Sequence, residues 1–236
     1  MVTIKGKKIA DLGYYINLDT RVDRKEKLEG QLVKFDIQGV ERFSAVNNTS
    51  TATVNCKRSH FELYQKLVDS EFDTLLVLED DCLFMDFLIE ESDKIFEDIN
   101  NTDWDVFWLG CRNRRSALPY KNNCYIVSSA SHAQSYLIKK DFAKHLIDTY
   151  PVYPHDNQSN LLPDELLTLA VYGKEVTTNP NEFNFYNLDQ PLDVLPTFFK
   201  GLTYEKSLST QYSSYSDLWG YVTNWEEYIT KSHPKS

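Results

Sequence analysis

The chain has 236 residues, of which 42% are hydrophobic and 14% aromatic. This composition excludes most disordered and low-complexity proteins, and the length suffices to bury a sizeable core. The formal net charge of −10 disfavours broad binding to nucleic acid or to anionic membranes. We therefore expect a single globular domain spanning residues 1–236.

Targeting and redox signals are weak. The longest aliphatic run, Leu75 to Leu78, is too short to span a membrane, and the lysine-containing N-terminus has no signal-peptide core. These features favour an intracellular, cytoplasmic protein. The cysteines are too far apart for a C-x-x-C zinc or redox motif, and we expect them to be reduced and mostly buried thiols: Cys56, Cys82, Cys111 and Cys124.

The first half of the chain alternates strand and helix patterns. Residues 14–18 form an apolar strand pattern, and a helical pattern begins near Thr20. Residues 40–46 predict a second strand. The capping-box pattern Ser59-x-x-Glu62 then predicts the start of a second helix.

The continuous apolar run 74–78 is typical of a strand that is buried on both faces of a parallel sheet. A helix over 85–96 and a strand over 104–109 follow. Further predicted elements are strands at 125–127 and 135–138, a helix at 142–147 and a helix opening at Pro163. Beyond Thr178 the chain is irregular and aromatic. The order predicts an α/β fold: a doubly wound, Rossmann-like sheet sandwiched by helices, with an irregular aromatic C-terminal tail.

Three consecutive carboxylates, Glu79, Asp80 and Asp81, follow the buried strand. Because neighbouring like charges disfavour joint ionisation, they favour a hard divalent cation, Mg²⁺ or Mn²⁺. The carboxyl ends of strands are also where open α/β sheets bind ligands. Side-chain alternation predicts that Glu79 and Asp81 share the ion and that Asp80 is left for a sugar hydroxyl. The alternative is a solvated turn that caps the following helix.

Eight short blocks resemble, in order, those of glycosyltransferase family 25, which includes bacterial lipopolysaccharide transferases and procollagen galactosyltransferases. The blocks are N-L-x-x-R-x-x-R at 17–24, R-x-x-A-V at 42–46, C-x-x-S-H at 56–60, L-E-D-D at 78–81, W-D-x-x-x-L-G at 104–110, Y-L-I at 136–138, the acidic block at 163–165, and Gln211 with Ser216-Asp217. The resemblance implies a GT-A fold, a UDP-sugar donor, a divalent metal and inversion at the anomeric carbon. Asn55 departs from the family pattern, which has glycine before the cysteine block.

The resemblance also implies roles for individual residues. Asp81 and Glu79 would bind the metal, and Asp164, with Glu165 in reserve, would be the catalytic base. The donor-binding residues would be Asn17, Arg21, Arg24, Ala45, Val46, Ser59, His60, Asp80 and Gln211.

Several of these residues also have a purely local explanation. Arg24 could pair with nearby acids such as Asp19 or Asp23. Ser59 could simply cap its helix. His60 would then lie in the first turn, where it either approaches the donor phosphates that helix amides favour or has a structural role. Asp164 could be favoured by a helix dipole alone.

The predicted activity is transfer of a hexose, galactose or glucose, to a hydroxyl group of a glycan, a lipopolysaccharide or a collagen-like hydroxylysine. Two alternatives stay open. A metal-dependent nucleotidyltransferase or phosphohydrolase could use the same acidic strand end, although the chain lacks the phosphate loop G-x-x-x-x-G-K-[ST]. A degenerate transferase fold could serve as a binding or scaffold module. The sequence does not indicate an oligomeric state.

Overall fold

The computed structural model describes residues 1–48, 51–113, 118–127, 130–150, 201–212, 214–216 and 221–223, together with Pro163 and Leu167. Among these residues, a central eight-stranded sheet has the order β10-β11-β14-β8-β13-β6-β3-β5. Its strands are β3 (Leu12–Asn17), β5 (Glu41–Ser44), β6 (Thr74–Glu79), β8 (Val106–Trp108), β10 (Leu118–Pro119), β11 (Cys124–Ile126), β13 (Ser135–Lys139) and β14 (Gly201–Tyr204).

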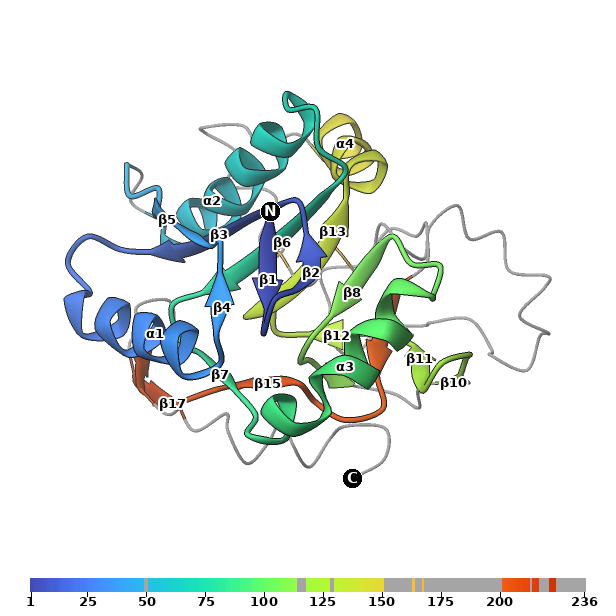
Figure 1. The fold of residues 1–236 in the computed structure, drawn as a ribbon. Helices are drawn as coiled ribbons and strands as arrows, with labels where there is room; N and C mark the ends of the chain where they lie inside the picture. Colours follow the sequence, from blue (N-terminus) through green and yellow to red (C-terminus); the bar gives the residue numbers. More distant parts are fainter. Residues whose placement is uncertain are drawn as a thin grey trace.

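The described helices are α1 (Val22–Lys34), α2 (Ala52–Val68), α3 (Phe87–Asn100) and α4 (Lys140–Thr149). Helices α2 and α4 pack together on one face of the sheet, and α1 and α3 lie on the other side (Figure 1). Strand β6 supplies both cores because its side chains alternate. Leu75 and Val77 pack with α2 and α4, whereas Leu76 and Leu78 pack with α1 and α3. The predicted α/β sheet between helices is confirmed.

Strand directions follow the prediction only in part. β5, β3 and β6 are parallel neighbours, and β14 is parallel to β8. β13 runs antiparallel to both β6 and β8, so the sheet is mixed. The described residues between β8 and β13 include short strands and no crossover helix. A parallel neighbour needs such a crossover, whereas an antiparallel neighbour does not. The doubly wound prediction was therefore wrong for this strand.

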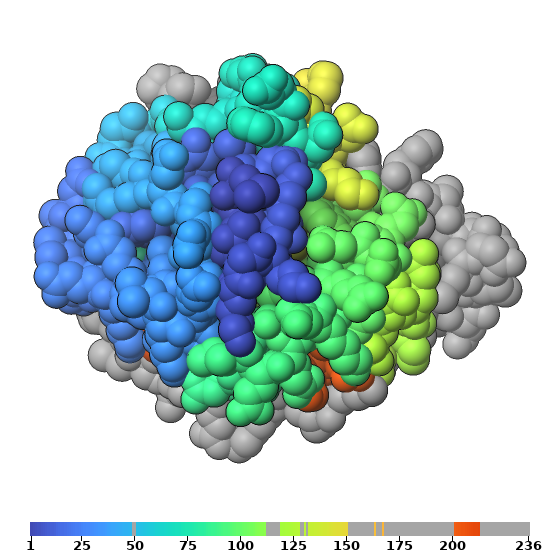
Figure 2. All heavy atoms as spheres, viewed as in Figure 1, coloured from blue at the N-terminus to red at the C-terminus, as the bar shows by residue number. Residues whose placement is uncertain are grey.

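Smaller sheets surround the central one. β1 (Val2–Ile4) pairs with β2 (Lys7–Ala10) and β4 (Ile37–Gln38), and Figure 2 shows the N-terminal residues in dark blue on the surface. Three further pairs are β7 (Cys82–Phe84) with β15 (Ser209–Gln211), β9 (Arg112–Asn113) with β12 (Ala130–Ser131), and β16 (Ser214–Ser216) with β17 (Tyr221–Thr223).

Part of the expected irregular tail is regular structure. β14 lies inside the central sheet between β11 and β8, and all four of its residues are buried. β15 pairs with β7, directly after the acidic triplet. The end of the chain thus contributes a strand to the core and a second strand to the neighbourhood of the carboxylates.

The predicted capping box is wrong. α2 begins at Ala52, so Ser59 and Glu62 lie well inside the helix rather than at its start. The Ser59 hydroxyl donates to the carbonyl of Asn55, one turn earlier, and accepts from the backbone N–H of Val46. His60 consequently lies away from the first turn and its free amide groups.

None of the four cysteines is in a disulfide bond, and Cys82, Cys111 and Cys124 are buried, as predicted. Within the described residues, none of the helices combines the length and the apolar composition that a membrane crossing requires.

A close backbone contact holds β15 against the central sheet. Leu208 N–H donates to Leu109 O at 2.7 Å, and a Cβ atom on Gly110 would lie 1.9 Å from Ser209 O. We expect Gly110→Ala to lower the free energy of unfolding by about 3 kcal/mol, because the backbones must separate. Gly30→Ala is the matched control: no atom lies within 4 Å of its added Cβ in α1, so helix propensity should stabilise the protein by about 0.5–1 kcal/mol.

Urea unfolding of the two glycine variants, followed by circular dichroism, measures both effects. A Gly110→Ala protein that is as stable as the wild type would show that β15 does not pack against Gly110.

Candidate active site at the carboxyl end of the central sheet

The acidic triplet lies where two parallel strands end together. Glu79 is the last residue of β6, and Asp80 and Asp81 form the connection to β7. β3 runs parallel beside β6, with Ile16 paired to Glu79, so Asn17 ends its strand next to the triplet. This edge of a sheet is the usual ligand-binding position in α/β proteins.

Asp80 is the most completely bonded carboxylate of the triplet. It is 6% exposed, and its two oxygens accept hydrogen bonds from Asn17 Nδ2 and Arg24 Nη1, both at 2.8 Å. Burial raises the pKa of Asp80, while the contacts with Arg24 and Asn17 lower it. Asp80 therefore anchors the turn to β3 and α1.

The carboxylates of Glu79 and Asp81 both lie close to one side chain, that of Gln211 in β15. Gln211 Nε2 lies 3.3 Å from Asp81 Oδ1 and 3.5 Å from Glu79 Oε2. Burial and the nearby charge of Glu79 raise the pKa of Asp81 to about 8, although Arg24 Nη1 lies 3.7 Å from its Oδ2 and opposes the rise. Ionising both carboxylates is therefore unfavourable unless a further positive charge is present.

The oxygen at the other end of the Gln211 amide lacks a partner among the described residues. Gln211 is 6% exposed, and its Oε1 is buried with no hydrogen-bond partner among the described residues. An unsatisfied buried acceptor costs about 1–3 kcal/mol. Two carboxylates and an amide oxygen are hard oxygen ligands, and Mg²⁺ or Mn²⁺ prefers such ligands. The residues present therefore fit a hard divalent cation.

Tyr212 fastens the same turn. Its backbone N–H donates to Asp81 O at 3.1 Å, and its hydroxyl donates to Asp80 O at 3.3 Å. Lys27 Nζ lies 3.2 Å from the centre of the Tyr212 ring. The predicted site residues did not include Tyr212, and its position next to Gln211 is the only sequence signal for it.

The two arginines of α1 behave differently. Arg21 makes two contacts with Asp23, at 3.0 Å and 2.9 Å, so local pairing occurs at this arginine. Arg24 reaches across to Asp80 and Asp81 and is 8% exposed. The first turn of α1 thus brings one buried positive charge to the triplet.

Asn17 and Arg42 connect the ends of β3 and β5. Arg42 donates from Nε to Asn17 Oδ1 at 3.0 Å and from Nη2 to Asp19 Oδ1 at 2.5 Å. Ala45 N–H donates to Asn17 O at 3.0 Å. Ala45 is therefore placed beside Asn17 by a backbone contact, and the neighbouring Val46 N–H is bound by the Ser59 hydroxyl. Arg42 is a site neighbour that the predicted residues did not include, although it belongs to the R-x-x-A-V block.

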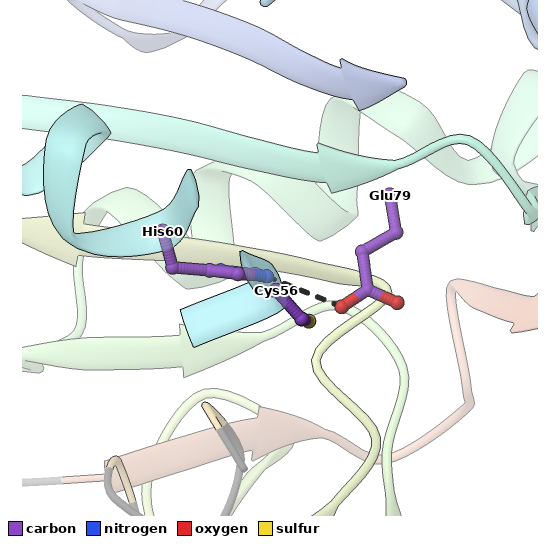
Figure 3. A group of neighbouring side chains, drawn as sticks. All are labelled: Cys56, His60 and Glu79. Carbon is purple, nitrogen blue, oxygen red and sulfur yellow. Dashed lines mark hydrogen bonds and ion pairs between the residues drawn. The ribbon is translucent and has the colours of Figure 1, made fainter. Parts of the chain in front are cut away.

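His60 reaches the triplet from α2. Its Nε2 lies 3.2 Å from Glu79 Oε1 (Figure 3). Its Nδ1 lies 2.7 Å from the Tyr136 hydroxyl. The ring is 1% exposed. The sequence gives no signal for the contact between His60 and Glu79, because the two residues come from different elements.

Comparison with known proteins agrees with the resemblance. Residues 48–161 match the family described as glycosyltransferase family 25 (LPS biosynthesis protein). This segment belongs to glycosyltransferase family 25. The family 25 segment contains the C-x-x-S-H and L-E-D-D blocks. Three residues outside this segment contact the carboxylates of its L-E-D-D block in the fold: Asn17, Arg24 and Gln211.

Named relatives include procollagen galactosyltransferases. Procollagen galactosyltransferase 2 of Mus musculus is 26% identical over 162 residues, which cover 63% of this chain and 25% of the mouse protein. The Homo sapiens protein of the same name is 22% identical over 161 residues, with the same coverage. Procollagen galactosyltransferase 1-B of Xenopus laevis is 22% identical over 226 residues, covering 80% of this chain and 36% of that protein. The chain spans about a quarter of the length of the mouse and human relatives.

Solved structures with some similarity include a glycosyltransferase involved in the glycosylation of the major capsid of PBCV-1. It has a TM-score of 0.44 and 11% identity, and the match covers 69% of this chain and 75% of that chain. A nucleoside-diphosphate-sugar pyrophosphorylase from Vibrio cholerae RC9 has a TM-score of 0.34 and 14% identity, covering 67% and 68% of the two chains.

Asp164 and Glu165, the two key positions of the acidic block, lie outside the described residues. Asp217 of the closing block does so too. The roles of these residues remain predictions from the sequence.

Proposed function

We propose that this family 25 chain transfers a hexose, galactose or glucose, from a UDP-sugar to a hydroxyl group of an acceptor. The acceptor is a glycan, a lipopolysaccharide or a hydroxylysine of a collagen-like chain. Family membership over residues 48–161 and the similarity to proteins named procollagen galactosyltransferase support the reaction class. The observation that carries the proposal is the half-buried Glu79 and Asp81 pair with the unpartnered Gln211 Oε1 beside it.

In this proposal Glu79, Asp81 and Gln211 hold Mn²⁺ or Mg²⁺. When bound, the cation would act as a Lewis acid that stabilises negative charge on the departing diphosphate. Asp80 orients the turn through Asn17 and Arg24, and faces the donor sugar or ribose. Arg24 adds a fixed positive charge beside the carboxylates, which favours a phosphorylated ligand.

The remaining donor contacts are proposed to come from the ends of neighbouring elements. Asn17, Ala45 and Val46 would line the uridine pocket. Arg21 would exchange its contact with exposed Asp23 for a phosphate oxygen. Ser59 would support Val46 through its hydrogen bond, and His60 would act through Glu79.

Transfer with inversion needs a base on the acceptor side of the sugar. We propose Asp164 for this role, with Glu165 in reserve. The base takes the proton of the acceptor hydroxyl while that oxygen bonds to the anomeric carbon from one face. The bond from the anomeric carbon to the UDP oxygen breaks on the opposite face, so the configuration inverts.

A donor panel tests the proposal. The full chain is incubated with Mn²⁺, one UDP-sugar at a time, and three acceptors: a hydroxylysine peptide, a lipopolysaccharide core and a short glycan. We expect a mass gain of one hexose on one acceptor, with UDP-galactose or UDP-glucose, and loss of that gain with a chelator. Turnover that attaches a nucleotide instead would support a nucleotidyltransferase. Absence of any metal-dependent product across the panel would contradict the proposal.

A further inference from the structure

A second group of potential ligands meets the site from the opposite side of Glu79. Cys56 Sγ, a ring nitrogen of His60 and a carboxylate oxygen of Glu79 all lie within 4.8 Å of one another. Cys56 and His60 are one turn apart on α2, and Figure 3 shows both pointing toward Glu79 at the end of β6. Side chains four residues apart share a helix face, so α2 presents sulfur and nitrogen together.

The orientation of His60 is set by two tyrosines. The Tyr136 ring stacks on the imidazole at a centroid distance of 5.9 Å and an interplanar angle of 11°. The Tyr136 hydroxyl lies 2.7 Å from His60 Nδ1 and 2.6 Å from the Tyr64 hydroxyl. These buried contacts hold Nε2 toward Glu79, as outer partners hold the histidine of a metal site.

His60 Nε2 faces Glu79 either as an N–H donor or as a lone pair, depending on which ring nitrogen carries the proton. When Nδ1 donates to Tyr136, and Tyr136 donates to Tyr64, Nε2 carries a lone pair that faces the carboxylate at 3.2 Å. Two acceptors at this distance require a proton or a cation between them. A proton would use only nitrogen and oxygen, whereas a metal ion would also use the sulfur of Cys56.

We propose that Cys56, His60 and Glu79 bind a thiophilic divalent cation of the Zn²⁺ class. Thiolate, imidazole and carboxylate are the three side-chain ligands that Zn²⁺ takes, and three protein ligands leave a fourth position for water. Binding forms a metal–sulfur bond and releases the thiol proton to solvent. This ligand set differs in chemistry from the all-oxygen set of Glu79, Asp81 and Gln211.

The two ligand sets share Glu79, so a cation in one is expected to weaken binding in the other. This inference goes beyond the proposed transferase function and does not depend on a sugar donor. It makes Zn²⁺ an antagonist of Mn²⁺ binding, although both are divalent.

Cobalt titration of the full chain tests the site, because Co²⁺ replaces Zn²⁺ and a bound thiolate gives a charge-transfer band in the near ultraviolet. We expect the band in the wild type, its loss on adding Zn²⁺, and its absence in Cys56→Ser. Cys124→Ser is the matched control and should keep the band, because Cys124 is buried on β11 and burial raises the pKa of its thiol to about 11.

A saturating Co²⁺ titration without the band, or the same band in Cys56→Ser, would overturn the proposal. Cobalt bound through oxygen ligands alone gives no thiolate band and counts against it as well. A second measurement uses the wild type only: Zn²⁺ should protect Cys56 from iodoacetamide, as mapped by peptide mass spectrometry. Alkylation of Cys56 at an unchanged rate would contradict the site even if Cys56→Ser did not fold.

Discussion

Asp81→Asn is expected to lower Mn²⁺-dependent hexose transfer roughly a thousandfold, a loss of about 4 kcal/mol in transition-state stabilisation. The substitution keeps the shape of the side chain but removes the charge that, with Glu79, would hold the cation. Initial rates at saturating UDP-hexose and Mn²⁺ measure the effect. The donor and acceptor are those identified by the panel.

The same variant should not lose stability. Burial and Glu79 raise the pKa of Asp81 to about 8, so the folded protein without metal gains nothing from ionising this group near neutral pH. We expect the melting temperature of Asp81→Asn without metal to equal or exceed that of the wild type, and Mn²⁺ to raise only the wild-type value.

Asp86→Asn is the matched control for Asp81→Asn. Asp86 lies five residues later, where its side chain is 82% exposed and pairs with Lys34 on the surface. Its neutralisation should leave transfer within about twofold of the wild type. Normal turnover by Asp81→Asn would remove Asp81 from the mechanism, and an equal loss in Asp86→Asn would point to a general charge effect.

Arg24→Leu is expected to lower the free energy of unfolding by about 3–5 kcal/mol, the usual result of leaving a buried charge without its partner. Arg24 donates to Asp80 at 2.8 Å, and both side chains are at most 10% exposed. The loss should be larger at neutral than at acidic pH, because removing Arg24 raises the pKa of the buried Asp80 further, and a protonated Asp80 needs no positive partner. Urea unfolding at the two pH values measures both effects.

Two further variants separate charge from packing at Arg24. Arg21→Leu removes an arginine that pairs with exposed Asp23, and it should cost less than about 1 kcal/mol. Asp80→Asn in the Arg24→Leu protein should recover most of the lost stability, because no buried charge then stands alone. If the double variant is no more stable than Arg24→Leu, the ion pair is not the cause.

The part of the site that is local in sequence could be predicted well. The apolar run of β6 followed at once by Glu79, Asp80 and Asp81 indicated both a buried strand and an acidic strand end. The alternating pattern also indicated helices on both faces, because Leu75 and Leu76 had to be covered on opposite sides. Strand direction was less accessible, because β13 has the same apolar pattern whether it runs parallel or antiparallel.

Contacts between distant elements could not be derived from residue types alone. The pairing of Arg24 with Asp80 joins residues 56 positions apart and depends on β3 lying beside β6. Gln211 reaches the carboxylates only because β15 pairs with β7, and the family resemblance alone indicated it.

The start of α2 shows how a short motif can mislead. Ser-x-x-Glu occurs at 59–62 in mid-helix, where the serine hydroxyl bonds to the preceding turn. Placing the helix start there hid the fact that Cys56 and His60 share a helix face. Their spacing of four residues was the available signal for the second ligand set.

Calorimetric titration of UDP into the full chain, with and without saturating Mn²⁺, tests the central claim most directly. The claim is that Glu79, Asp81 and Gln211 hold a cation that binds the nucleotide diphosphate. We expect UDP to bind at least about tenfold more tightly with Mn²⁺, a difference of about 1.4 kcal/mol, and this gain to vanish in Asp81→Asn. Equal UDP affinity with and without Mn²⁺ would contradict the account.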